Sequence, residues 1–182
     1  MKLSRLLVTA LLVLPSLARA AGEPAEGLLV QSEPAGGLRA RATLHLPAPP
    51  SAVQHILTDY DHWPSLFNVT MRVNRVDRRP GLVLVDLAIG HPFLFGESRL
   101  VSENRELPEG GLVTSLLSGD FKRYHRVWKL SPDGDPAATR AEFELLVEAD
   151  TWAPDWLVAF ELRRQLEKHF HLLQRAVEKR AH

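Results

Sequence analysis

The C-terminal stretch of the chain, from Pro154 to about Lys179, constrains the fold more than any other segment. A proline suits the first turn of a helix, where its missing N–H costs nothing. A helix of this length with one apolar stripe needs a surface to cover that stripe, so the rest of the chain is expected to supply one. Apolar residues spaced three and four apart mark the stripe: Ala159, Leu162, Leu166, Phe170, Leu173 and Val177.

The first twenty residues are typical of a secretory signal peptide. A short positive region precedes an apolar run from Leu6 to Leu17, and Ala18-Arg19-Ala20 forms an A-x-A cleavage site. The run is shorter than the roughly 20 apolar residues that a spanning helix needs. A buried N-terminal helix is the competing interpretation. We predict a signal peptide over 1–20, a single domain over 21–182, and a periplasmic or secreted location.

Charge and cysteine content exclude several classes of protein. The chain holds 22 basic and 22 acidic side chains and no cysteine. Removing the signal peptide takes away three basic and no acidic residues, so the mature chain is slightly acidic. That balance argues against a nucleic-acid or polybasic membrane role. Without cysteine there is no disulfide, thiolate metal site or cysteine nucleophile, and an exported domain would be held together by its core.

Alternating apolar residues predict strands between the leader and the long helix. Two strands open the domain, at Leu28–Val30 and Leu38–Leu46. A short helix over Ser51–Thr58 and a turn leading into a second short helix through Phe67 follow. Consecutive hairpins imply an antiparallel sheet, and a sheet with one apolar face needs one cover. We therefore predict an α+β fold, with a curved sheet of about six to seven strands against the C-terminal helix. The consecutive strands are expected at 69–76, 83–89, 93–103, 112–117, 121–130 and 139–149.

Three stretches of the chain carry a family pattern. The first runs from Ala48 to Pro64 and includes Leu57-Thr58-Asp59-Tyr60 and Trp63-Pro64. The second is Trp128-Lys129-Leu130-Ser131-Pro132, and the third is the helix entry Pro154-Asp155-Trp156-Leu157-Val158. With these motifs the chain resembles the START-like (SRPBCC, helix-grip) superfamily, and most of all its polyketide cyclase/dehydrase and coenzyme Q-binding group. Gln54 stands where the family pattern has a tryptophan.

The resemblance extends over nearly the whole mature chain and implies more than a fold class. It implies two short helices after the first core strand, a sheet wrapped around the long helix, and an apolar cavity between them. Members of the superfamily bind lipids, sterols, quinones or polyketides, and some are enzymes. The implied partner is thus a hydrophobic small molecule.

Motifs for metal, nucleotide or nucleophile chemistry are missing from the sequence. His169 and His171 are two residues apart on a helix and so point in different directions. His62 lies close to Asp59 and Asp61, a spacing that more often makes a hydrogen-bonded turn. There is no G-x-S-x-G or phosphate-binding glycine motif. We predict no catalytic residue, no metal and no cofactor.

Ionisable residues on neighbouring strands leave acid–base chemistry open. If two of them face the cavity, a general acid and base become available; otherwise they face solvent. A guanidinium inside an apolar cavity needs a partner, and an acidic lipid or enolate would serve, which singles out Arg99 and Arg126. The full set is His91, Glu97, Arg99, Tyr124, His125 and Arg126.

Aromatic side chains are more numerous than the helix stripe requires, although some must belong to the core. Trp152, Trp156 and Phe160 surround the start of the long helix, which borders the cavity mouth in a helix-grip fold. There they are expected to guide an apolar ligand or to touch a membrane surface transiently. The predicted ligand-binding set is Met71, Phe93, Phe95, Arg99, Tyr124, Arg126, Trp128, Trp152, Trp156 and Phe160.

Three functions are compatible with these patterns. The first is an exported binding or carrier protein that holds a lipid, sterol-like molecule or quinone without covalent chemistry. The second is a cyclase/dehydrase-type enzyme that uses acid–base residues of the same cavity, a function that export disfavours. The third is a protein-interaction module with a vestigial cavity. The sequence does not specify the ligand or the oligomeric state.

Overall fold

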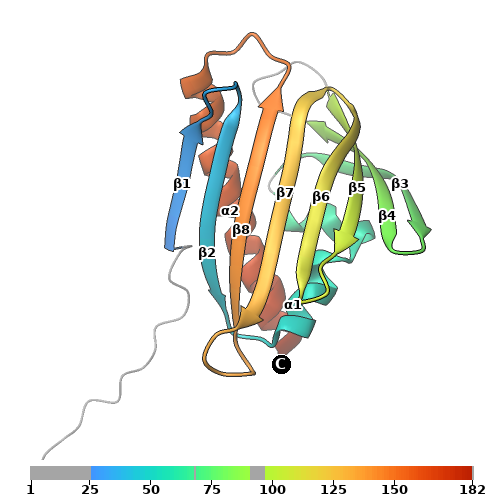
Figure 1. The fold of residues 1–182 in the computed structure, drawn as a ribbon, viewed down its shortest axis with the longest axis vertical. Helices are drawn as coiled ribbons and strands as arrows, with labels where there is room; N and C mark the ends of the chain where they lie inside the picture. The colour runs from blue at the N-terminus through green and yellow to red at the C-terminus, as the bar shows by residue number, and fades with distance from the viewer. Residues whose placement is uncertain (1–25, 68, 91–96, 182) are drawn as a thin grey trace, which may run out of the picture.

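The computed structural model describes residues 26–67, 69–90 and 97–181, which form one curved sheet with a long helix across one of its faces (Figure 1). The predicted signal peptide lies outside these residues, as do Phe93 and Phe95. In chain order the elements are β1 (Glu26–Ser32), β2 (Leu38–Leu46), α1 (Pro50–Leu57), the 3-10 helix η1 (Tyr60–Leu66), β3 (Met71–Arg79), β4 (Leu82–Gly90), β5 (Glu97–Glu106), β6 (Gly111–Gly119), β7 (Phe121–Pro132), β8 (Thr139–Ala149) and α2 (Asp155–Ala181).

The sheet is antiparallel throughout and has the strand order β1-β2-β8-β7-β6-β5-β4-β3. Strands β3 to β8 follow one another as hairpins. The pair β2–β8 joins the two ends of the domain, with Leu38 opposite Val147 and Leu46 opposite Thr139. This architecture confirms the predicted α+β helix-grip fold. The sheet has eight strands rather than six to seven, because both opening strands, β1 and β2, join the six consecutive strands in a single sheet.

The core lies between the sheet and the C-terminal half of α2. Strand β2 buries every second residue, from Leu38 to Leu46, as its alternation predicts. From α2, Phe170 and Leu173 reach into this layer, and the Phe170 ring packs edge-on against Phe143 at 5.1 Å between centroids. Fully burying a side chain of this size contributes about 1.5–3 kcal/mol, so the stripe of α2 accounts for much of the docking energy of the helix.

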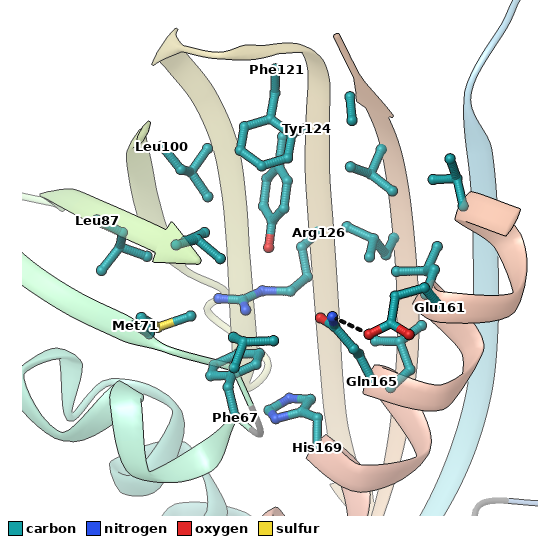
Figure 2. Close-up of a pocket in the computed structure, with 18 of the residues that line it drawn as sticks. Phe67, Met71, Leu87, Leu100, Phe121, Tyr124, Arg126, Glu161, Gln165 and His169 are labelled. Atoms are coloured by element: carbon teal, nitrogen blue, oxygen red, sulfur yellow. Dashed lines mark hydrogen bonds between the residues drawn. The ribbon is translucent and has the colours of Figure 1, made fainter. Parts of the chain in front are cut away.

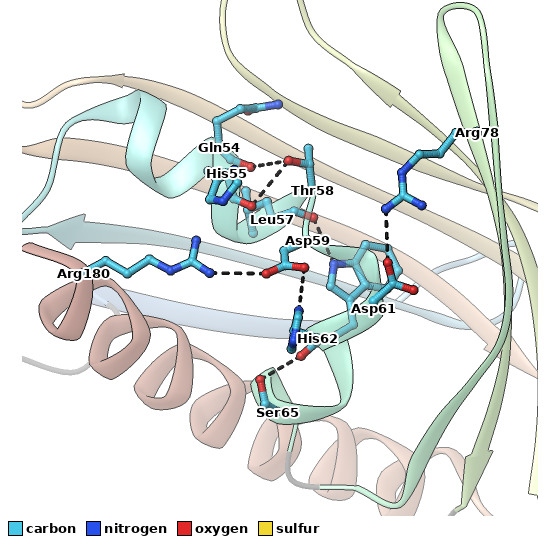
Figure 3. A network of polar contacts seen from close by, with 11 residues as sticks. Gln54, His55, Leu57, Thr58, Asp59, Asp61, His62, Ser65, Arg78 and Arg180 are labelled. Atoms are coloured by element: carbon cyan, nitrogen blue, oxygen red, sulfur yellow. Dashed lines mark hydrogen bonds and ion pairs between the residues drawn. The ribbon is translucent and has the colours of Figure 1, made fainter.

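A polar network ties the far end of α2 to the turn between α1 and β3 (Figure 3). Arg180 near the end of α2 pairs with Asp59 at 3.3 Å, and His62 bonds the other oxygen of the same carboxylate at 2.7 Å. Asp61 points elsewhere and pairs with Arg78 of β3 at 3.2 Å. The turn is therefore held from two sides, and η1 lies against the C-terminal half of the helix.

Gln54 has a structural role at the position where the family pattern has a tryptophan. Its side-chain oxygen accepts a hydrogen bond from the backbone N–H of Gly111 at 2.8 Å, and its Nε2 donates to Glu106 at 2.7 Å. A Cβ at Gly111 would lie 2.1 Å from the carbonyl oxygen of Trp128, so only glycine fits there. The amide thus fastens α1 to the β5–β6 turn.

Candidate functional site

A cavity of about 190 Å³ lies between the inner face of the sheet and the N-terminal half of α2 (Figure 2). This is more than ten times the roughly 10–15 Å³ that one water molecule needs. Its walls come from strands β3 to β8, from η1, and from α2 together with the segment that precedes it. Most of the lining is aliphatic or aromatic. The polar exceptions are Thr114, Tyr124, Arg126, Thr151, Glu161, Gln165 and His169.

Strand β7 contributes a bulky and a charged side chain to the cavity because of its alternation. Tyr124 and Arg126 lie two residues apart on one face, and Trp128 continues that face into the core. A β-bulge between Phe121 and Arg123 shifts the register at the start of the strand. Phe121 therefore also faces the cavity, although it lies three positions before Tyr124 in the sequence, and the two rings meet edge-on at 5.9 Å.

Arg126 is the charged group of β7 inside this cavity, and it is only 5% exposed. Its Nη2 donates to the hydroxyl of Thr114 at 3.2 Å, and its guanidinium carbon lies 4.8 Å from the centre of the Trp63 ring. Its Nε is buried without a hydrogen-bond partner. Within the described part of the chain, no carboxylate forms an ion pair with it.

Behind Arg126 runs a short chain of neutral polar groups. The Thr114 hydroxyl donates to the Asn104 side-chain oxygen at 2.8 Å, and the Asn104 amide donates to the Ser102 hydroxyl at 3.2 Å. These three residues lie on the inner face of β5 and β6 and are fully buried. They fix the position of one guanidinium nitrogen but bring no negative charge to it.

His169 of α2 lines the same cavity and is neutral. Its Nδ1 lies 2.6 Å from the backbone oxygen of Leu66, and because a carbonyl only accepts, Nδ1 carries the proton. Its Nε2 is thus an acceptor, and it is buried without a partner. The ring stacks on Phe67 with centroids 4.1 Å apart. Burial, with a smaller contribution from the charge of Arg126, lowers the pKa of His169 to about 4.

Glu161 is the acidic residue that lines the cavity, but its charge is already compensated. Arg164 donates two hydrogen bonds to it at 2.9 and 2.7 Å, and Gln165 donates a third at 2.7 Å. Burial acts to raise the pKa of Glu161, yet these hydrogen bonds outweigh it and the pKa is lowered. Glu161 is therefore ionised at neutral pH and is held by residues of its own helix.

The structure brings three of the predicted ligand-binding residues together in the cavity: Met71, Tyr124 and Arg126. Trp128 lies in the adjoining core layer, where it packs against Phe143 at 4.7 Å. Trp152, Trp156 and Phe160 are 85, 71 and 61% exposed. They project outward from the segment whose neighbouring residues Ala153, Leu157 and Val158 line the cavity.

Arg99 does not reach the cavity, contrary to the expectation that it faces an enclosed ligand. Its neighbour Leu100 points inward, so the alternation of β5 turns Arg99 to the outer face. There its side chain is 60% exposed and makes two hydrogen bonds to Asp86, at 3.1 and 2.7 Å. The guanidinium of Arg99 therefore has its partner on the surface.

The acid–base set is likewise divided between the two faces. Glu97 pairs with Arg72 at 3.0 Å, and His125 contacts the Ser115 hydroxyl at 3.1 Å, both on the exposed side. His91 lies outside the described residues. Tyr124 and Arg126 face the cavity, so two members of the predicted set share it, together with His169.

Several cavity residues were missing from the sequence prediction: Phe67, Thr114, Leu157, Glu161, Gln165 and His169. Glu161 and Gln165 lie outside the predicted apolar stripe of the helix, which is only as wide as close packing requires. Above the core, the helix borders a cavity instead of a packed layer, and a wider arc of it is enclosed. The residues on either side of the stripe were the signal in the sequence from which these cavity residues could have been found.

The described residues contain no cluster of three or more histidine, aspartate or glutamate side chains that could hold a metal ion. In the same ranges no helix is long and apolar enough to cross a membrane.

Comparison with known proteins identifies the family. Residues 46–169 match the model of the family described as "Polyketide cyclase / dehydrase and lipid transport". The chain belongs to that family. The match covers all of the elements from α1 to β8 and the cavity-lining part of α2. No curated protein matches the chain significantly.

Solved structures of the START superfamily share this fold. A START superfamily protein from Mycobacterium smegmatis superposes with a TM-score of 0.61 at 19% identity, covering 78% of this chain and 97% of its own. The Zhui aromatase/cyclase from a Streptomyces species has a TM-score of 0.62 at 13% identity, over 79% and 95% of the two chains. An 18 kDa protein from Caulobacter crescentus is 26% identical, with a TM-score of 0.55 over 79% and 95%. Family, fold and apolar cavity together indicate binding of a hydrophobic small molecule.

Proposed function

We propose that this protein is an exported carrier that holds a hydrophobic molecule, such as a lipid, a sterol-like molecule or a quinone, between the sheet and α2. The observation that carries the proposal is the cavity itself, which is enclosed by apolar side chains in a chain with a signal-like N-terminus. Lipid transport is also among the activities in the description of the family. No covalent step is needed for this function.

Apolar burial is the main favourable term for binding in such a carrier. Each Å² of apolar surface removed from water contributes about 25 cal/mol. A ligand that buries about 300 Å² would gain about 7.5 kcal/mol before the entropic costs of association are subtracted. Because those costs offset part of this gain, the binding is expected to be reversible, as a carrier that must release its ligand requires.

A cyclase/dehydrase-type enzyme is the second candidate, and one arrangement favours it. Tyr124, Arg126 and His169 line one cavity. The neutral His169 has an unprotonated Nε2 that can accept a proton, and the nearby guanidinium could stabilise an enolate. Export to the periplasm, which remains part of the proposal above, disfavours this candidate because polyketide intermediates usually stay on cytoplasmic carriers.

Material that co-purifies with the protein distinguishes the candidates. The full chain would be expressed with its own leader, isolated from the periplasm, and analysed by native mass spectrometry and solvent extraction. A carrier should retain an apolar molecule at one copy per chain and release it unchanged in mass. An enzyme should convert added substrate to a product of different mass. A protein that is empty as isolated and binds no apolar probe would contradict the carrier function.

A further inference from the structure

Arg126 places a positive charge in the cavity without a counter-charge. Burying an ionised side chain is costly unless it is paired and hydrogen-bonded. Here one nitrogen bonds Thr114, the Trp63 ring faces the guanidinium, and Nε has no partner. These contacts come from neutral groups, so the charge itself is uncompensated within the described part of the chain.

The neighbouring ionisable groups do not supply the missing negative charge. Glu161 is ionised, but its charge is already paired with that of Arg164 at 2.7 Å. Burial raises the pKa of Tyr60 to about 12, which keeps its phenol neutral. His169 is neutral as well, as its buried position dictates. The stretch 91–96 contributes no acidic residue to the chain, since it reads His-Pro-Phe-Leu-Phe-Gly. Among the described residues, no side chain supplies a counter-charge to Arg126.

The placement of Arg126 fits a ligand that enters the cavity. Figure 2 shows its side chain extending from β7 into the space between Met71 on one side and Gln165 on the other, with the Tyr124 hydroxyl pointing towards it. The Thr114–Asn104–Ser102 chain holds one guanidinium nitrogen from behind. The guanidinium is therefore pre-positioned, and little side-chain entropy is lost when a ligand binds it.

The number of donors indicates the charge of the ligand. One guanidinium offers a planar fork that matches a carboxylate. A phosphate monoester carries a charge of about −1.5 to −2 and presents three strong acceptor oxygens, which calls for more cationic donors than this cavity provides. The remaining walls are apolar and suit a hydrocarbon body.

We propose that the ligand is an amphipathic monoanion of the fatty-acid class, whose carboxylate binds Arg126 while its apolar body fills the rest of the cavity. This inference rests on the proposed carrier function and specifies the substrate class of the same site. It assigns Arg126 as the residue that selects acids over neutral lipids of the same shape. Tyr124 is placed to donate a second hydrogen bond to the same carboxylate.

A matched pair of fluorescent probes tests the inference. Dansyl-undecanoic acid and its methyl ester have the same apolar body and differ in charge, and each would be titrated into the full chain at neutral pH. The wild-type protein should bind the acid about tenfold or more tightly than the ester, as loss of one charge-assisted contact implies. In Arg126→Met this preference should fall to within about threefold, through weaker binding of the acid.

Arg99→Met is the matched control, because it removes a guanidinium from the outer face of the same sheet. It should leave the acid-to-ester preference unchanged. Equal affinity of wild-type protein for the two probes, or an unchanged preference in Arg126→Met, would overturn the inference and leave the carrier function standing. If neither probe binds, both proposals are wrong.

The thermal unfolding midpoint, measured with and without ligand, provides a second and independent readout. Removing an unpaired buried charge should leave Arg126→Met at least as stable as wild type without ligand. At one fixed concentration, dansyl-undecanoic acid should raise the midpoint of wild type by more than that of the variant. If Arg126→Met does not fold, the wild-type preference for acid over ester decides the matter by itself.

Discussion

His169 is a buried histidine whose two ring nitrogens have different surroundings. Nδ1 donates to the backbone oxygen of Leu66, and Nε2 is buried without a hydrogen-bond partner. Protonation of Nε2 would therefore introduce a charge that the core cannot solvate, next to the charge of Arg126. At the scale of single residues, this makes His169 one group through which a low pH should weaken the fold.

We predict that the free energy of unfolding falls as the pH is lowered from about 6.5 to 4. The ordinary pKa of histidine is 6.5 and that of folded His169 is about 4. The unfolded chain therefore takes up this proton first, and the stabilisation present above pH 6.5 is lost as pH falls towards the folded pKa. The difference amounts to about 3 kcal/mol. Urea unfolding at a series of pH values measures it.

The control for this prediction is His169→Asn, whose side-chain amide can still donate to Leu66. Its unfolding free energy should lose less with acid than that of the wild type, by the same amount of about 3 kcal/mol. Equal slopes of stability against pH in the two proteins would show that His169 is not the responsible group. Carboxylates such as Glu161 contribute equally to both curves and cancel in the comparison.

At the scale of elements, α2 is one helix with two functions along its length. Its C-terminal half supplies closely packed residues such as Leu173, whose side chain is fully buried. Its N-terminal half supplies Leu157 and Val158 to the wall of the cavity. The network around Asp59 and Arg180 fastens the packed end of the helix to the turn before η1.

Two alanine substitutions on this helix should separate the functions. Leu173→Ala leaves a cavity in a packed layer and should cost about 2–5 kcal/mol of stability. Leu157→Ala enlarges an existing cavity and should cost about 1 kcal/mol or less, while weakening the binding of an apolar probe several-fold. Chemical unfolding and probe titration measure the two effects. Equal stability losses would mean that the N-terminal half is also packing core.

In strand β7, a β-bulge places a side chain on a face that simple alternation would not predict. Without the bulge between Phe121 and Arg123, Phe121 and Tyr124 would face opposite sides of the sheet. The bulge turns Phe121 inward, where its ring lines the cavity and packs against that of Tyr124. Its neighbours Arg123 and Lys122 pair with Glu148 of β8 and with Asp150, the residue that follows β8.

At the scale of the whole molecule, three exposed aromatic residues lie beside the cavity on the outside. Trp152, Trp156 and Phe160 belong to the segment whose other side lines the cavity. We propose that this aromatic rim touches a lipid bilayer transiently, since tryptophan favours the membrane–water interface. A carrier with its entrance against the bilayer would spare an apolar ligand a passage through water.

Tryptophan fluorescence can test this contact directly. Trp63 and Trp128 are buried, whereas Trp152 and Trp156 are exposed, so a change in emission reports on the rim. Phosphatidylcholine vesicles should shift the emission to the blue, with little dependence on salt. A Trp152→Ala/Trp156→Ala double variant should co-sediment less with the vesicles than Leu29→Ala, which removes an exposed leucine of β1. Equal sedimentation of the two would exclude the rim as the contact.

Much of the fold could be predicted because its signals are local. The alternation of β2 and β8 sets their bounds at 38–46 and 139–149, which the structure confirms. The spacing in α2 places Leu166, Phe170, Leu173 and Val177 in the core. Turn residues between the strands imply consecutive hairpins, and one long amphipathic helix leaves a single element to cover the sheet.

The membership of the cavity could not be predicted in the same way, because it depends on contacts between distant strands. Alternation says that Arg99 and Arg126 each lie on one of two faces, but pairing and bulges decide which face is covered by α2. Arg99 consequently meets Asp86 outside, and Arg126 meets Thr114 inside. The local sequence patterns thus specify a curved sheet packed against one long helix. The unpaired charge of Arg126 in the cavity between them depends on the strand register of the folded sheet, which local patterns do not determine.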